Sequence, residues 1–184
     1  DAAFGLKAIG KVGQNRDNQG LSEYSIAANA TAIYQGDPVE MLATGTIGVA
    51  AAGDTLLLGP LTGVFYTDAS TSKPTWANHL NASNTATDIV GFVSDDPYER
   101  FEVQADGATA AADVGLNADI VYAAGSSPDY VSKVELQTSD QKAGTAQLRI
   151  MGISKDPSND TAGSANVNLV VMINEHFLKG TVGI

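Results

Sequence analysis

The chain of 184 residues contains no cysteine, which excludes disulfide frameworks, zinc sites built from thiolates and thiol nucleophiles. Positive charge is also scarce, because 10 Lys and Arg face 21 Asp and Glu, for a formal net charge of −11. Such a surface repels phosphate backbones and anionic lipid headgroups, so we expect neither nucleic acid nor a membrane as a partner. No apolar run approaches the roughly 20 residues that a membrane-spanning helix needs.

Histidine is nearly absent, with only His79 and His176. Neither lies beside both an acid and a nucleophile in the sequence, and no HExxH, GxSxG or Walker motif occurs. We therefore expect a structural or surface role for both histidines, no enzymatic activity and no cofactor. A hydrolase that uses two of the many carboxylates is an alternative, and it requires a deep pocket with two facing acids.

Two groups of oxygen-bearing side chains offer ligands to a cation. One group is Asp95, Asp96 and Glu99, and the other is Asn159 with its neighbouring aspartates 156 and 160. Calcium prefers roughly six to eight oxygen ligands, and neither group has the spacing of a known calcium loop. Asp and Asn at turns commonly cap their own backbone, so we expect no metal site.

Small residues and turns dominate what is present. The chain has 27 Ala and 19 Gly residues, a quarter of the total. Turn signals containing Gly, Pro or Asx residues recur along the chain and leave segments of mostly five to ten residues between them. Short strands at this spacing are typical of a β-sandwich or barrel. The turn signals include Gly36-Asp37-Pro38, Asp95-Asp96-Pro97, Asp106-Gly107 and Asp156-Pro157.

Hydrophobic alternation supports the same fold class. Residues 101–105 and 147–151 alternate apolar and polar side chains, as strands with one buried face do. Residues 89–93 and 167–173 are more apolar throughout, which favours central strands or strands at a subunit interface. The sequence therefore predicts an all-β fold, with a β-sandwich or barrel-like (jelly-roll-like) body over residues 21–184.

The first 20 residues differ from the rest. Isolated apolar residues alternate there with Gly and with three of the ten basic residues, whereas residues 17–132 hold only two basic residues against 15 acidic ones. This charge asymmetry predicts an extended, cationic N-terminal arm over residues 1–20 that lies on a neighbouring protein. A disordered terminus is the alternative.

Aromatic residues are few, and Phe65, Tyr66 and Trp76 lie close together in the sequence. Because large aromatics dominate core energetics, we expect these side chains to fill the core. A sugar-stacking platform is the alternative interpretation.

Seven stretches, taken together in their order and spacing, resemble the small capsid decoration (cement) proteins of tailed bacteriophages. The resemblance spans roughly residues 2–178. The stretches that carry it are Tyr24–Ala27, Gly36–Val39, Gly63–Phe65, Ser94–Pro97, Phe101–Gly107, Asp113–Ile120 and Ile173–Phe177.

The resemblance implies a structural protein of the virion. Such a protein sits on the outer surface of an HK97-like capsid, binds the major capsid protein and clamps neighbouring capsomers, commonly as a homotrimer at threefold and quasi-threefold sites. It also implies that an N-terminal arm contacts the coat protein and that no catalytic residue is present. The capsid-contact residues that we transfer to this chain are Phe4, Leu6, Lys7, Ile9, Lys11 and Arg16.

Two other functions fit a small anionic β protein. One is a secreted or virion-borne β-sandwich module that binds carbohydrate through Trp76 and nearby aromatics. The other is a different virion component, such as a head-fibre base or a tail-tube protein.

Overall fold

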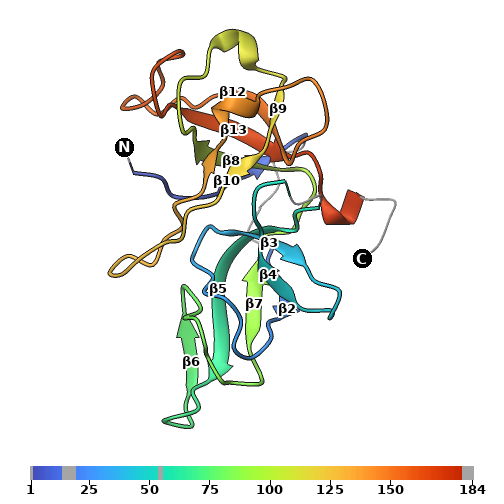
Figure 1. Ribbon diagram of the computed structural model, residues 1–184, viewed down its shortest axis with the longest axis vertical. Helices are drawn as coiled ribbons and strands as arrows, with labels where there is room; N and C mark the ends of the chain where they lie inside the picture. Colours follow the sequence, from blue (N-terminus) through green and yellow to red (C-terminus); the bar gives the residue numbers. More distant parts are fainter. Residues whose placement is uncertain (1, 14–19, 54–55, 180–184) are drawn as a thin grey trace.

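The computed structural model describes residues 2–13, 20–53 and 56–179. Its strands form antiparallel sheets in two lobes, which lie one above the other along the long axis of the molecule (Figure 1). The predicted all-β class and sandwich-like body are confirmed.

The upper lobe is built on a five-stranded antiparallel sheet with the order β1-β8-β13-β12-β9. A two-stranded sheet, β10-β11, contributes side chains to the same hydrophobic core. The strands are β1 (Lys7–Lys11), β8 (Glu99–Gln104), β9 (Asn117–Ala118), β10 (Ile120–Val121), β11 (Glu135–Leu136), β12 (Leu148–Ile153) and β13 (Asn168–Ile173).

Alternation along these strands creates the upper core. Phe101 and Val103 of β8, together with Leu148 and Ile150 of β12, are at most 1% exposed, while Arg149 between them on β12 is exposed. Side chains at every second position share a face, so each strand presents one apolar row inward. The predicted alternating strands around residues 101–105 and 147–151 are therefore confirmed.

The lower lobe holds the second sheet, in the order β2-β7-β5-β3-β4, with β6 paired to the far part of β5. A separate hydrophobic core fills this lobe. The strands are β2 (Ser22–Ser25), β3 (Pro38–Met41), β4 (Ile47–Val49), β5 (Gly59–Thr67), β6 (Pro74–Ala77) and β7 (Val90–Val93). The two most apolar predicted strands are central, since β7 lies between β2 and β5, and β13 lies between β8 and β12.

The two lobes exchange side chains at their junction. Ala50, just after β4, and Leu57, just before β5, are buried in the upper core. Phe177, which follows β13, packs in return against the lower core. The N-terminal segment also joins them, because Leu6 is buried in the upper core while its N–H donates to the carbonyl of Gly36 at 2.9 Å.

Helical structure in the described residues is limited to three single-turn 3-10 segments: η1 (Ala111–Asp113), η2 (Thr138–Asp140) and η3 (Phe177–Lys179). Within those same residues no helix is long and apolar enough to span a membrane.

The N-terminal segment differs from the expected arm. β1 is an edge strand of the upper sheet, where Lys7 pairs with Glu102 and Lys11 pairs with Glu99 of β8. Leu6 is only 2% exposed. Burial of this side chain and pairing along β8 both hold the segment against the body, because an apolar residue and an unpaired sheet edge each gain from a partner. Over Leu6 to Lys11, the segment is therefore part of the body.

Candidate functional site

The structure describes five of the six residues predicted to contact a capsid, and it places them in different environments. Leu6 is buried, Phe4 and Lys11 are half-buried, and Lys7 and Ile9 are exposed on β1. Ile9 is the extra residue of a β-bulge between Ala8 and Gly10, and it is 45% exposed. The sixth predicted residue, Arg16, lies outside the described residues.

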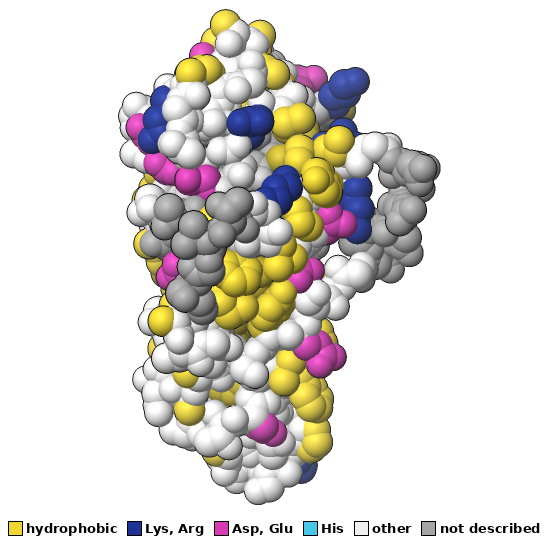
Figure 2. Space-filling model, turned by 90° about the vertical axis from the view of Figure 1, so that its right-hand side faces the viewer, with side chains coloured by type: hydrophobic (Ala, Val, Ile, Leu, Met, Phe, Trp, Pro, Cys, Tyr) yellow, Lys and Arg dark blue, Asp and Glu magenta, His cyan; other side chains and the backbone are white. Residues whose placement is uncertain are grey.

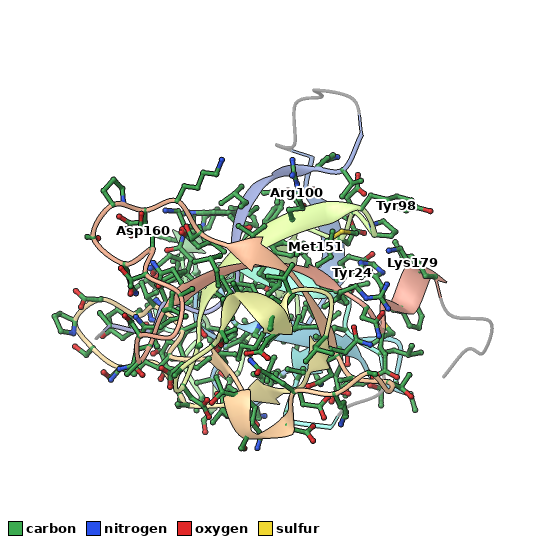
Figure 3. The ribbon with its side chains drawn as sticks, turned by 90° about the horizontal axis from the view of Figure 1, so that it is seen from above. Tyr24, Tyr98, Arg100, Met151, Asp160 and Lys179 are labelled. Atoms are coloured by element: carbon green, nitrogen blue, oxygen red, sulfur yellow. The ribbon has the colours of Figure 1, made fainter. Side chains whose placement is uncertain are left out.

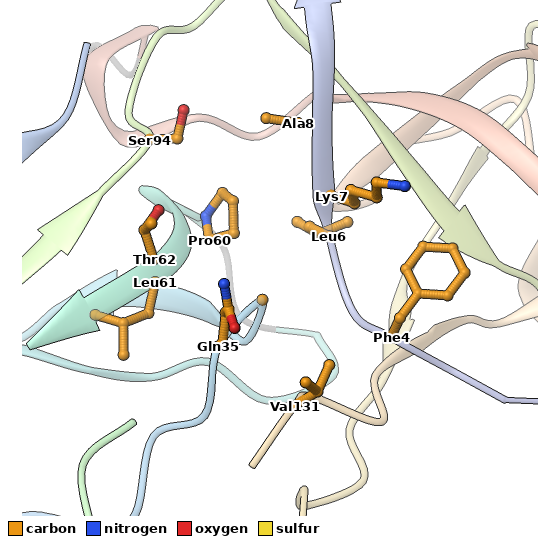
Figure 4. Close-up of a pocket in the computed structure, with 11 residues that line it drawn as sticks. Phe4, Leu6, Lys7, Ala8, Gln35, Pro60, Leu61, Thr62, Ser94 and Val131 are labelled. Carbon is orange, nitrogen blue, oxygen red and sulfur yellow. The ribbon is translucent and has the colours of Figure 1, made fainter. Parts of the chain in front are cut away.

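Three of these residues line one groove at the junction of the lobes. Phe4, Leu6 and Lys7 form one wall of this groove, which has a volume of about 390 Å³. Residues of the lower lobe and Val131, from the segment between β10 and β11, form the other (Figure 4). We call it the junction groove. Its remaining lining residues are Ala8, Gln35, Gly36, Pro60, Leu61, Thr62, Ser94 and Val131.

The junction groove runs beside an edge of β1 that has no strand partner among the described residues. Backbone groups of successive strand residues point to opposite edges. Since the N–H of Leu6 points to Gly36 and not to β8, the backbone of Ala8, two residues later, points to the same outer edge. Ala8 also lines the groove. An apolar groove and an exposed backbone edge therefore lie side by side.

The two lysines of β1 are held differently. Lys11 forms a 2.6 Å ion pair with Asp96, and its side chain is 20% exposed. This contact lowers the pKa of Asp96. Lys7 lies 3.8 Å from Glu102, and its side chain is 68% exposed. The ion pair of Lys11 therefore stabilises the fold, while the side chain of Lys7 remains accessible to a partner beside the groove.

The first predicted cation cluster is committed to internal contacts. Asp95 accepts hydrogen bonds from the hydroxyls of Tyr24 at 2.6 Å and Ser22 at 2.9 Å. Glu99 is buried and accepts a hydrogen bond from the Ser94 hydroxyl. Among the described residues there is no group of three or more His, Cys, Asp or Glu side chains arranged to hold a metal ion.

The aromatic residues near Trp76 do not fill the core as expected. Trp76 is 56% exposed and Phe65 is 42% exposed, because their cross-strand pair lies on the outer face of the lower sheet. The Trp76 ring lies 5.0 Å from that of Phe92 and covers Gly63, where a Cβ atom would be 2.4 Å from the indole. Only Tyr66 packs against the lower core. We call Phe65, Trp76 and Phe92 the aromatic face.

The two histidines occupy different environments. His176 is 1% exposed at the lobe junction, and its Nδ1 accepts a hydrogen bond from the N–H of Leu178 at 3.1 Å. Burial lowers its pKa to about 4. His79 stacks on Tyr130 with ring centroids 3.8 Å apart and an interplanar angle of 3°. Both contacts fix loops to the body.

Charge is distributed unevenly between the lobes. Lys73 is the only Lys or Arg in residues 20–98, a stretch that holds eight Asp and Glu residues. In Figure 2 the dark blue side chains gather over the upper half of the visible face. In the view from above (Figure 3), Arg100 and Met151 lie on the upper sheet, and Lys179 lies next to Tyr98, with its amine 4.5 Å from the ring centroid.

Comparisons of this chain with protein-family models, with curated proteins and with solved structures find no match. Phe4, Leu6 and Lys7 were predicted from the sequence as contact residues, whereas the opposite wall of the groove that they line was not predicted. That wall comes from separate segments at residues 35–36, 60–62, 94 and 131, and no local pattern marks them.

Proposed function

We propose that this protein is a capsid decoration protein, which binds the major capsid protein on the outer surface of an HK97-like phage head and stabilises the head by clamping neighbouring capsomers. The observation that carries the proposal is the pairing of the β1 edge with the junction groove. This combination suits a partner protein, because it offers backbone hydrogen bonds and apolar contact together.

The docking mode that fits this geometry is strand addition. An extended segment of a coat protein lies along β1, forms hydrogen bonds with the outward-pointing backbone of Ala8, and places alternate side chains in the groove. Phe4 and Leu61 provide apolar contacts on opposite walls. Lys7 favours an acidic residue in the docked segment.

The charge distribution supports one orientation on the particle. The lower lobe, with its single lysine, faces outward, where its negative charge keeps particles apart in solution. The upper lobe, which carries β1, faces the coat.

Clamping follows from linkage. A partner that binds only the assembled lattice stabilises that lattice by mass action. A homotrimer at threefold and quasi-threefold sites engages several coat subunits at once, so each contact can be weak. The predicted location is the outer surface of the virion.

The test uses phage heads that lack this protein. Purified protein is added to them, bound protein is measured after sedimentation, and the heads are challenged by heat and by osmotic shock. We expect saturable binding and fewer ruptured heads. If wild-type protein neither binds nor protects the heads, the proposed function is refuted.

The docking mode has its own variant. Ala8→Pro removes an N–H that points to the outer edge, and proline is tolerated at such edge positions. We expect a folded protein that no longer binds heads. The control is Ala43→Pro in an exposed turn closed by the Gly45 N–H and the Leu42 carbonyl, where proline fits the second turn position. Normal binding by Ala8→Pro would refute strand addition while leaving decoration standing.

One observation favours a second candidate function, a secreted or virion-borne carbohydrate-binding module. The exposed ring of Trp76 on the aromatic face offers a stacking surface, which the expected core position would not. A glycan array that compares wild-type protein with Trp76→Ala tests this candidate. Equal signals from both proteins would show that the aromatic face is not a carbohydrate-binding site.

A further inference from the structure

The strongest unexplained feature outside the junction groove is a buried amide. Gln104, at the end of β8, is only 4% exposed, and its Oε1 is buried without a hydrogen-bond partner among the described residues. A buried acceptor in this state costs about 1–3 kcal/mol. A hydrogen-bond donor from outside the described residues would therefore stabilise the side-chain oxygen of Gln104.

Gln104 lines a polar pocket on the outer face of the upper sheet. The pocket has a volume of about 430 Å³, within the range of small-molecule sites. Asn168 of β13 pairs with Gln104 across the sheet, so both side chains point into the space below the loop of residues 154–166. The other lining residues are Ala2, Phe4, Asp156, Ser158, Asn159, Ala165 and Asn166. We call this the amide pocket.

The loop above the amide pocket is fixed in place by its own hydrogen bonds. The Nδ2 of Asn159 donates to the carbonyl of Asn166 at 2.7 Å and to the Oδ1 of Asn168 at 2.9 Å. The Oδ1 of Asp156 accepts from the backbone N–H of Ser158 at 3.0 Å and from its hydroxyl at 2.8 Å. A pocket held this way loses little conformational entropy when a ligand binds.

The lining chemistry indicates the class of ligand. Gln104 and Asp156 present oxygen acceptors, the asparagine side chains present amide groups, and the half-buried ring of Phe4 forms an apolar wall. A ligand must therefore donate and accept hydrogen bonds within a few ångströms and also present an apolar face. Polyhydroxylated rings meet all three requirements.

The charges around the amide pocket further restrict the class of ligand. Asp156 is the one charged residue of the lining, and the nearby ammonium of Lys7 acts on it electrostatically. The protein as a whole is strongly anionic, which disfavours acidic ligands. Lys7 also lies 3.8 Å from Glu102, so its charge is shared between two carboxylates and gives an acidic ligand no advantage.

We infer that the amide pocket binds a neutral saccharide unit, with a sugar hydroxyl donating to Oε1 of Gln104 and the sugar ring lying against Phe4. This goes beyond the proposed decoration function, and it concerns a different surface from the aromatic face. On a phage head, such a pocket would give the particle weak, multivalent adhesion to glycan-coated surfaces.

The experiment uses the isolated protein labelled with ¹⁵N and the methyl glycosides of glucose, galactose, mannose and N-acetylglucosamine as probes. Side-chain amide resonances are assigned, and each glycoside is titrated to high millimolar concentration. We expect at least one glycoside to shift the resonances of Gln104 and Asn168 saturably. If no glycoside shifts them, or if the shifts are confined to the aromatic face, the inference is wrong.

Gln104→Met provides the decisive variant. The side chain is similar in size, and it removes the unpartnered acceptor, so the protein should fold at least as stably as wild type. We expect glycoside affinity to fall by about tenfold or more, the equivalent of one lost hydrogen bond to a buried group. The control, Val114→Ala, changes a partly exposed side chain outside the pocket lining and should leave the affinity unchanged. Unchanged affinity in Gln104→Met would overturn the assignment.

A calcium chloride titration without sugar tests whether the amide pocket binds a cation instead of a saccharide. Calcium that shifts the same resonances, while the glycosides do not, would make the amide pocket a cation site and refute the saccharide assignment. Because no capsid enters these measurements, their outcome is independent of whether the protein decorates heads.

Discussion

Gly5 passes so close to Gly36 that a Cβ atom at position 5 would lie 2.4 Å from the carbonyl oxygen of Gly36. Gly5 also has a positive φ of 72°. The contact brings the N-terminal segment against the lower lobe just before Leu6 enters the upper core. The absence of a side chain at position 5 therefore permits this close approach beside Gly36, which lines the junction groove.

The Gly5→Ala variant should destabilise the protein strongly. Both the left-handed backbone and the overlap with Gly36 oppose a Cβ atom, so we expect the free energy of unfolding to fall by about 3–5 kcal/mol. The control is Gly45→Ala, which has a similar φ of 76° but no atom within 4 Å of the added Cβ. It should lose only about 1 kcal/mol. Urea unfolding of both variants gives the comparison, and equal losses would contradict the close approach.

Removing residues 1–11 should damage the body. The deletion takes away β1 and the buried side chain of Leu6, which leaves β8 with an open edge and the upper core with a cavity. Leu6→Ala alone should lower the free energy of unfolding by about 2–5 kcal/mol, and the deletion should lower it further. Urea unfolding with circular dichroism measures both effects. A truncated protein as stable as wild type would show that this segment is a detachable arm.

Local pattern was enough to predict the strands β7, β8, β12 and β13. Alternation at residues 101–105 predicts β8, and the apolar run at residues 167–173 predicts a central strand, which β13 is. Both predictions depend only on side chains within one strand. A strand's own residues decide which of its faces is apolar, so these elements are readable without knowing their neighbours.

The candidate sites depend on pairings that local pattern does not contain. Lys7 pairs with Glu102, 95 positions along the chain, so a sequence that looked like a free arm is a sheet edge. Trp76 lies outside because β6 pairs with β5 in a register that stacks the indole over Gly63. In the sequence, Gln104 looks like any polar strand residue. Its burial depends on the loop of residues 154–166, which covers it in the fold. In each case a distant partner decides the environment.

Burial of Asp37 makes stability depend on pH. Its side chain is fully buried, and burial raises the pKa to about 6 even though the carboxylate accepts a 2.8 Å hydrogen bond from the N–H of Tyr34. The unfolded chain releases this proton near pH 4. The folded state therefore holds an extra proton between about pH 4 and pH 6, and stability falls as pH rises through this window.

The Asp37→Asn variant isolates this effect. Asparagine keeps an acceptor for the N–H of Tyr34 but has no proton to lose. Its stability relative to wild type should therefore rise by about 2–3 kcal/mol between pH 4 and pH 7. Urea unfolding at several pH values measures the difference. A constant offset between the two proteins would show that Asp37 has an ordinary pKa.

His176 should produce the opposite dependence in an overlapping window. Burial lowers its pKa to about 4, whereas the unfolded chain takes up this proton near pH 6.5. The stability that the neutral imidazole contributes is complete above about pH 6.5 and is lost as pH falls toward 4, by up to about 3 kcal/mol. In the wild-type protein this loss is partly offset by the gain from Asp37, so only variants separate the two.

His176→Asn keeps an acceptor near the N–H of Leu178 and stays neutral, and it should be less stable than wild type at pH 7. That deficit should shrink by about 2–3 kcal/mol at pH 4. Unfolding curves that stay parallel from pH 7 to pH 4 would show that His176 is protonated in the folded protein as readily as in the unfolded chain, and the buried junction between the lobes would then have to be open to water.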